Sequence, residues 1–218
     1  MKHLLPLLPL AALLAGCSRP AEPVAPPAPP PPLSPEVQQR AAERGRQIAA
    51  ATFSVLSSNL QSAIQSGGVV NALPFCSLAA APLTKSVAQE HGVSVRRVTH
   101  RPRNPAARAN PQEAAVLEGF AAAIAAGATN PPPTAVVTNL VPGHATYFAP
   151  ILLSHTLCLQ CHGDPERDIP PDALATLRRL YPQDEATGFQ PGQLRGLWRI
   201  DLPLAALNDP MPEAAPSP

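Results

Sequence analysis

The pattern of apolar and polar residues predicts helices in the first half of the chain and strands in the second. Ser34 and Pro35 suit a helix cap and a first turn. Apolar residues then recur along one helical stripe as far as Gln65. These residues are Val37, Ala41, Ile48, Val55 and Ile64. Gly67 and Gly68 are predicted to stop this helix, and a second helical stretch is predicted from near Pro74 to Gly92.

The middle of the chain predicts one strand and one capped helix. VSVRRVTH, residues 93–100, is typical of a strand, whereas the proline-rich RPRNPAARANP that follows favours irregular structure. Asn110, Pro111 and Glu113 then match a capping box at a helix start. We expect Val116, Phe120 and Ile124 to share one buried face of this helix, and Gly127 to close it.

Later segments predict an antiparallel sheet. Residues 134–140 and 144–154 read as two strands around a turn at Pro142 and Gly143. Residues 171–181 read as a short helix, and residues 197–204 as a strand with Trp198, Ile200 and Leu202 on one face. Helices grouped early and strands grouped late indicate an α+β domain with flanking helices, not a βαβ array.

The first sixteen residues are predicted to be an export signal. A basic start at Lys2 precedes an apolar run that is shorter than the roughly 20 residues needed to span a membrane. The end of the run, Leu-Ala-Gly-Cys at residues 14–17, resembles a bacterial lipobox, in which Cys17 would be acylated and would anchor the chain. An ordinary cleaved signal is the alternative. By the same resemblance Ser18 favours the outer membrane over the inner one, with the protein on its periplasmic face.

The ends of the mature chain have a different composition from its middle. Nine of the 31 prolines fall in residues 18–35, which predicts that residues 17–35 form an extended spacer behind the anchor. Residues 206–218 read as a disordered tail, which leaves one domain over 36–205. Removal of Lys2 with the signal balances the basic side chains against 15 acidic ones. This neutrality, and an arginine run broken by prolines, give nucleic-acid binding no support.

The cluster CLQCH, residues 158–162, predicts covalent attachment of one haem c. Two residues between Cys158 and Cys161 allow both thiols to form thioethers along one porphyrin edge, and the adjacent His162 then reaches the iron. A redox dithiol normally sits in a βαβ unit, and a structural zinc site needs four ligands. Neither context is visible in the sequence, and a redox dithiol, a zinc site and a simple disulfide, which is sterically possible in an exported protein, are the alternatives.

Methionine is not expected as the second axial ligand of such an iron. Met1 would leave with the signal, and Met211 lies in the proline-rich tail. Once the other cysteines are assigned, Cys76 remains as an unpaired thiol in an oxidising compartment. It is either a small buried apolar residue or an iron ligand, and a position in the first turn of a helix starting near Pro74 would favour its thiolate. The other candidate ligands are His91, His100, His144 and His155.

Several stretches resemble a family of bacterial c-type haem proteins with a PAS-like fold. They are AxPFC, RPRNPA, a helix ending EGF, YFAPI leading into CLQCHGD, and LYPQDEATGFQPGQLRG. The family has a cyanobacterial, cytochrome-like founding member, and related domains occur in sensor kinases, often as an uncharacterised domain. The resemblance covers about residues 36–204, and it implies a PAS-like antiparallel sheet with a long N-terminal helix. It also implies His162 and Cys76 as the axial ligands of the iron.

Other pocket residues are expected from chemistry and from this resemblance. Arg101 and Arg103 match haem propionates in charge and geometry. Tyr147 and Phe148, with Phe75, are candidate pocket walls, and ordinary core packing is the equal alternative.

The expected function is a lipid-anchored periplasmic redox or gas sensor, or a one-electron transfer protein, with no enzymatic turnover. A plain electron carrier of a membrane redox chain is the alternative, and it is favoured by the lack of a kinase or transmitter segment in this sequence. A haem peroxidase is less expected because no distal acid-base pair is visible. The partners would be an unidentified redox or signalling protein, the membrane and a small gas ligand.

Overall fold

The computed structural model describes residues 32–128, 135, 137–138 and 140–207. The predicted signal, Cys17, most of the proline-rich spacer and most of the tail lie outside these residues. Leu207 is 4% exposed and packs in the main core, so the folded region extends just past the expected domain end at residue 205.

Four strands form one antiparallel sheet in the order β1-β4-β3-β2. They are β1 Ser94–Val98, β2 Val137–Thr138, β3 His144–Leu152 and β4 Leu194–Pro203. The predicted antiparallel pairing across the turn before β3 is confirmed, with Val137 opposite Tyr147. In β4, alternation places Trp198, Ile200 and Leu202 in one core cluster as predicted.

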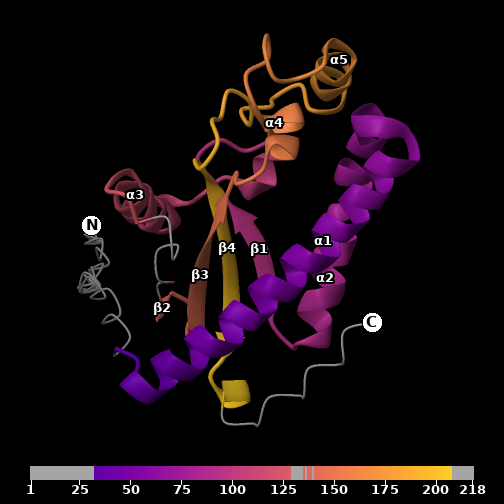
Figure 1. The fold of residues 1–218 in the computed structure, drawn as a ribbon. Helices are drawn as coiled ribbons and strands as arrows, with labels where there is room; N and C mark the ends of the chain where they lie inside the picture. Colours follow the sequence, from indigo (N-terminus) through magenta and orange to yellow (C-terminus); the bar gives the residue numbers. More distant parts are fainter. Residues whose placement is uncertain (1–31, 129–134, 136, 139, 208–218) are drawn as a thin grey trace, which may run out of the picture.

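Two helices cover one face of the sheet. α1 (Pro35–Leu78) crosses the strands obliquely, and α2 (Ala80–Glu90) runs back beside it (Figure 1). Ala41 and Ile48 of the predicted stripe are fully buried in the cluster that contains Trp198. The helix approaches the sheet closely at Gly45, where a Cβ atom would lie 2.2 Å from the Tyr147 ring.

α1 contains a kink at Gly67 and Gly68, which have non-helical backbone angles. Gly68 has φ 75° and ψ −176°, a region that essentially only glycine occupies. The predicted break is therefore present at the expected place. The predicted start of the next helix near Pro74 is wrong, because the helical backbone resumes directly after the kink and Pro74 lies inside α1.

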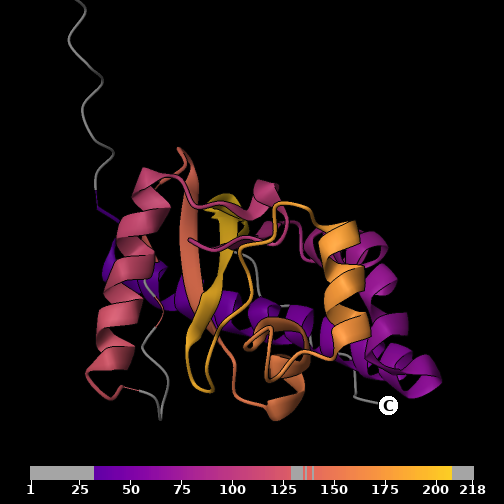
Figure 2. The same cartoon turned by 90° about the horizontal axis from the view of Figure 1, so that it is seen from above.

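The opposite face of the sheet is covered by α3 (Pro111–Ala125), as Figure 2 shows. Its predicted capping box is present, with Asn110 and Glu113 bonded reciprocally. Leu117 and Phe120 pack on Val98 and Phe148. The predicted Val116 and Ile124 are only half-buried, because the buried stripe is centred on Glu113, Leu117 and Phe120.

Two short helices lie beyond one end of the sheet, near the kinked end of α1 (Figure 1). They are α4 (Thr156–His162) and α5 (Pro171–Leu180), and single 3-10 turns occur at Pro105–Ala107 and Ala205–Leu207. The α+β architecture, with its long N-terminal helix on an antiparallel sheet, is PAS-like, as expected. Among the described helices none alone is long and apolar enough to cross a membrane, and only α1 and α2 together, bent by 51°, pass that test.

Candidate functional site

The CLQCH cluster forms all of α4 except its first two residues. Helical periodicity places Cys158, Cys161 and His162 on one side of this helix, because residues three and four positions apart are neighbours on a helix surface. The thiols of Cys158 and Cys161 are free in the structure. The two cysteines and the histidine are thus presented together in one direction.

His162 is oriented by a hydrogen bond from its ring. Its Nδ1 donates to the backbone oxygen of Ala186 over 2.8 Å, which leaves Nε2 with no hydrogen-bond partner among the described residues. Burial, followed by the nearby charges of Arg103 and Arg195, lowers the pKa of His162 well below its usual range. The imidazole is therefore neutral at physiological pH, with one nitrogen anchored and the other available, as in metal-ligating histidines.

The loop 184–189 is attached to the C-terminal end of α4. The backbone N–H groups of Gly188 and Phe189 donate to the oxygens of Gly163 and His162, at 2.6 and 2.9 Å. Gly163 also allows the turn after α4 to pack closely, since a Cβ atom there would lie 2.6 Å from the side chain of Asp168. The carbonyls that the end of a helix leaves unpaired are satisfied by this loop, which fixes the position of His162.

Arg101 and Arg103 hold the same loop. Arg103 donates to the backbone oxygen of Cys161 at 2.5 Å and forms a 3.0 Å ion pair with Asp184. Arg101 donates to the backbone oxygens of Glu185 and Thr187 and lies 4.2 Å from the centre of the Phe189 ring. Arg103 is thus bonded to the CLQCH cluster itself, whereas Arg101 is bonded to the loop beside it.

Apolar side chains surround both thiols. Cys158 packs against Leu153 and Phe189, and Cys161 packs in a separate cluster with Ile169 and Leu177. Burial raises the pKa of Cys161 to about 11, although Arg103 opposes this shift. The thiol of Cys161 is therefore protonated and lies in an environment suited to an apolar macrocycle.

Cys76 is close to this cluster, but its position within its helix differs from the one expected. Its charge would contribute to the pKa of Cys161, and it interacts electrostatically with Arg97 and Arg103. The expected first-turn position is wrong, because Cys76 lies in the last turn of α1, where the helix dipole disfavours a thiolate. Burial also raises the pKa of Cys76, which favours its protonated thiol.

The candidate wall residues Tyr147 and Phe148 are deep in the protein core. Tyr147 is 5% exposed beneath α1, and Phe148 is fully buried beneath α3. The apolar clusters that contain Tyr147 and Phe148 include none of the CLQCH residues, so both side chains are part of the ordinary core, which was the stated alternative. Phe75 is half-buried in the last turns of α1, the segment that also carries Cys76.

The other histidines are found at the ends of elements. His91 follows α2, His155 precedes α4, and His100 is exposed beyond β1. The ring of His144, at the start of β3, lies 3.0 Å from the backbone oxygen of Pro142.

Two residues near the site had no role in the sequence analysis. Arg195 of β4 is half-buried, and its guanidinium lies 5.5 Å from the centre of the Phe189 ring. Phe189 in turn meets the His162 ring edge-on at 6.4 Å. Both belong to the stretch GFQPGQLRG, which carried the family resemblance, but no periodicity or spacing assigned a role to either residue.

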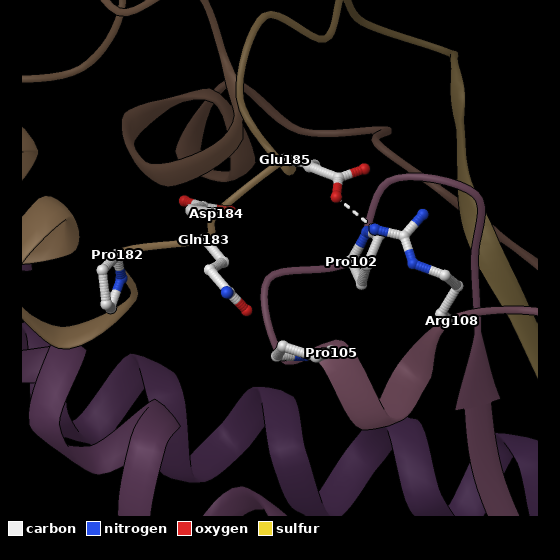
Figure 3. Close-up of a pocket in the computed structure, with 7 residues that line it drawn as sticks. All are labelled: Pro102, Pro105, Arg108, Pro182, Gln183, Asp184 and Glu185. Carbon is white, nitrogen blue, oxygen red and sulfur yellow. Dashed lines mark hydrogen bonds and ion pairs between the residues drawn. The ribbon is translucent and has the colours of Figure 1, made fainter.

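A pocket of about 530 Å³ opens beside the loop 184–189 (Figure 3). Two of its lining residues, Arg108 and Glu185, form an ion pair, and its lining contains none of the CLQCH residues. Its lining residues are Pro102, Pro105, Arg108, Pro182, Gln183, Asp184 and Glu185.

The donor set fits a covalently bound haem. Two free thiols and an imidazole with an available Nε2 share one side of α4, and a further thiol lies nearby. These groups are not arranged to bind a bare metal ion together, since no group of three or more His, Cys, Asp and Glu side chains in the described part of the chain could do so. The arrangement is thus that of a PAS-like α+β domain with a Cys-X-X-Cys-His helix beside its sheet.

The chain belongs to the Tll0287-like family, whose model matches residues 34–203. Among solved structures it is similar to the cyanobacterial heme-protein Tll0287, with a TM-score of 0.51 and 24% sequence identity. That match covers 78% of this chain and 97% of the other. No match was found among curated proteins.

Proposed function

We propose that this protein is a c-type haem protein that carries one haem through thioethers to Cys158 and Cys161. The observation that carries the proposal is the His162 ring, anchored at Nδ1 and available at Nε2 on the same side of α4 as two free thiols. The family of the chain and the haem in the similar cyanobacterial structure support it. Haem would supply a one-electron couple and an iron to which small molecules can bind.

His162 is proposed as one axial ligand. The hydrogen bond to Ala186 fixes both the tautomer and the rotation of the ring, so the ligand is oriented before the metal arrives. Because the imidazole is already neutral, no proton has to be displaced when Nε2 binds iron.

Cys76 is proposed as the opposite ligand. Its thiol lies near Cys161, on a segment whose direction is set by the kink at Gly68. The buried surroundings of Cys76 favour its protonated thiol. If reduction of the iron weakened the bond to sulfur, Cys76 would take up a proton from solvent and would leave the metal. This residue would then act as the switch of a redox or gas sensor.

We place the protein on the periplasmic face of a bacterial membrane, the outer one favoured, with Cys17 as its lipid anchor. A redox or signalling protein is its proposed partner, and no enzymatic turnover is proposed. The alternative is a plain electron carrier. Binding of CO or NO with release of Cys76 would favour the sensor, whereas rapid reversible electron exchange without gas binding would favour the carrier.

Production of the full-length protein in a host with cytochrome maturation machinery tests the cofactor. We expect a coloured protein whose haem stays attached after denaturation, with a thioether-type pyridine haemochrome spectrum. The double variant Cys158→Ala/Cys161→Ala should lose attached haem. Colourless wild-type protein, or haem that is extracted on denaturation, would contradict the proposal.

The axial ligands are tested in the same preparation. Cys76→Ala should keep the attached haem but change the visible spectrum of the ferric protein, because a thiolate ligand is lost. Ser77→Ala, one position along the same helix, is the matched control and should leave the spectrum unchanged. An unchanged ferric spectrum in Cys76→Ala would rule out ligation by Cys76.

A further inference from the structure

Four arginines gather around the loop 184–189 with too few carboxylates to balance them. They are Arg97, Arg101, Arg103 and Arg195. The charges of the first three act on Arg195, and those of Arg97, Arg103 and Arg195 act on His162. Arg103 is paired with Asp184. In the described part of the chain, the other three form no salt bridge. This end of the sheet therefore has an excess of positive charge that an anion would balance.

Arg195 has an unused pair of donors. Its Nη1 donates to Thr99 Oγ1 at 3.2 Å and to the backbone oxygen of Arg101 at 3.0 Å. Nε is buried without a hydrogen-bond partner, and Nη2 has none either among the described residues. Nε and Nη2 form the edge of a guanidinium that binds a carboxylate through two parallel hydrogen bonds. A buried donor left unpaired is destabilising, so a ligand that completes this edge would stabilise the site.

The surroundings of Arg195 favour an anion at this edge. Burial, followed by the charges of Arg97 and Arg103, lowers the pKa of Arg195 to about 9. Arg97 is solvent-exposed, yet burial is the main cause that lowers its pKa too.

Arg195 is close to His162, the proposed iron ligand, because the Phe189 ring contacts both side chains. Arg195 and Arg101 both approach the Phe189 ring, which meets His162 edge-on. Arg101 and Arg103, the arginines first expected to bind propionates, donate instead to backbone oxygens of the loop and to Asp184. Among these four arginines, Arg195 is the one with a buried side-chain donor that has no hydrogen-bond partner in the described part of the chain.

We propose that Arg195 binds a propionate carboxylate of the haem through Nε and Nη2, with Arg97 as a second, longer-range positive charge. The inference rests on the proposed function and adds a residue that fixes the cofactor at the edge away from its thioethers. Arg101 and Arg103 then have the separate task of holding the loop that orients His162.

The test uses the full-length holoprotein with Arg195→Gln and Arg195→Lys. Loss of a positive charge next to a propionate stabilises the ferric state, so Arg195→Gln should lower the midpoint potential. It should also shift the propionate bending band in the resonance Raman spectrum, with haem still attached. Arg195→Lys keeps the charge but has no two-pronged edge, so it should shift the Raman band with a smaller change in potential. Arg167→Gln, an exposed arginine after α4, is the control and should change neither quantity.

The outcomes separate the inference from the proposed function. Wild-type protein without covalent haem would overturn the function before any variant is measured. Attached haem with an unchanged potential and Raman band in Arg195→Gln would overturn the propionate assignment alone. A wild-type potential that depends on phosphate concentration at fixed ionic strength, with Raman bands insensitive to both substitutions, would assign the site to a free anion and also overturn it.

Discussion

Glu113 is a fully buried carboxylate that joins a helix start to the sheet. It accepts hydrogen bonds from Arg199 at 2.7 Å and Arg96 at 3.2 Å, and it closes the capping box with Asn110. Arg199 also bonds Asp201, which accepts from Thr146. A buried charge with this many partners stabilises the fold only while every partner is present.

Replacement of this carboxylate by an amide tests the network. We expect Glu113→Gln to lower the free energy of unfolding by about 3 kcal/mol, because Arg199 would lose a charged partner in a poorly solvated position. Denaturant unfolding at neutral pH measures the change. Glu43→Gln removes a carboxylate from an exposed ion pair with Arg46 and should change stability by less than about 1 kcal/mol. Equal effects of the two substitutions would show that the buried network contributes nothing specific.

At the scale of elements, the contact between α1 and the sheet depends on a missing side chain. Gly45 faces the Tyr147 ring so closely that any Cβ atom would overlap it. We expect Gly45→Ala to destabilise the protein by about 1–3 kcal/mol, despite the higher helix propensity of alanine. Gly119→Ala in α3 has nothing within 4 Å of the new atom and should instead stabilise by about 0.5–1 kcal/mol. Thermal unfolding of both variants measures the contrast, and a stabilising Gly45→Ala would refute the close approach.

The kink in α1 depends on backbone conformation instead of packing. A Cβ atom at Gly68 would meet nothing within 4 Å, so only its backbone angles oppose a substitution. We expect both Gly68→Ala and Gly68→Asn to be destabilising by about 1–3 kcal/mol, since asparagine tolerates the left-handed helical region but not ψ near 180°. Chemical unfolding measures both variants, and rescue by asparagine would contradict the conformation at the kink.

The kink also has a consequence for the site. The segment after Gly68 carries Cys76, so a straightened helix would move this thiol away from α4. In the holoprotein, Gly68→Ala should therefore show part of the spectral change expected for Cys76→Ala. A wild-type ferric spectrum in Gly68→Ala would separate the kink from axial ligation.

For the whole molecule, local sequence patterns predicted most helices and strands, but they did not predict the contacts between elements that are distant in sequence. The capping box at Asn110, the glycine break and the alternation in β4 depend on neighbouring residues, and the structure confirms all three. The helix start near Pro74 failed, because a proline that is tolerated inside a helix looks the same in sequence as one that begins it.

The site follows the same division between local and distant contacts. CLQCH is a local signal, and the structure brings its three chemical groups to one side of α4. The hydrogen-bond acceptor of the His162 ring is the backbone oxygen of Ala186, and a backbone acceptor cannot be predicted from a pattern of side chains. The unused edge of Arg195 could not be predicted from the sequence, because the partners that occupy its other donor, Thr99 and Arg101 after β1, are distant in the chain.

The described part of the molecule consists of a sheet with helices on both faces and an end region formed by α4, α5 and the loop 184–189. The sheet has a core on each face, whereas the apolar clusters around Cys158 and Cys161 are small and separate from them and from each other. A macrocycle bound to both cysteines would touch both small clusters and tie α4 to the rest of the fold. We expect haem attachment to increase amide-exchange protection in α4 and α5 by at least about tenfold, equivalent to about 1.4 kcal/mol. Amides of β4 around Ile200, in the main core, should change much less. Hydrogen exchange of the holoprotein against the full-length Cys158→Ala/Cys161→Ala variant makes the comparison, and equal protection of α4 in the two proteins would show that the end region is ordered without its cofactor.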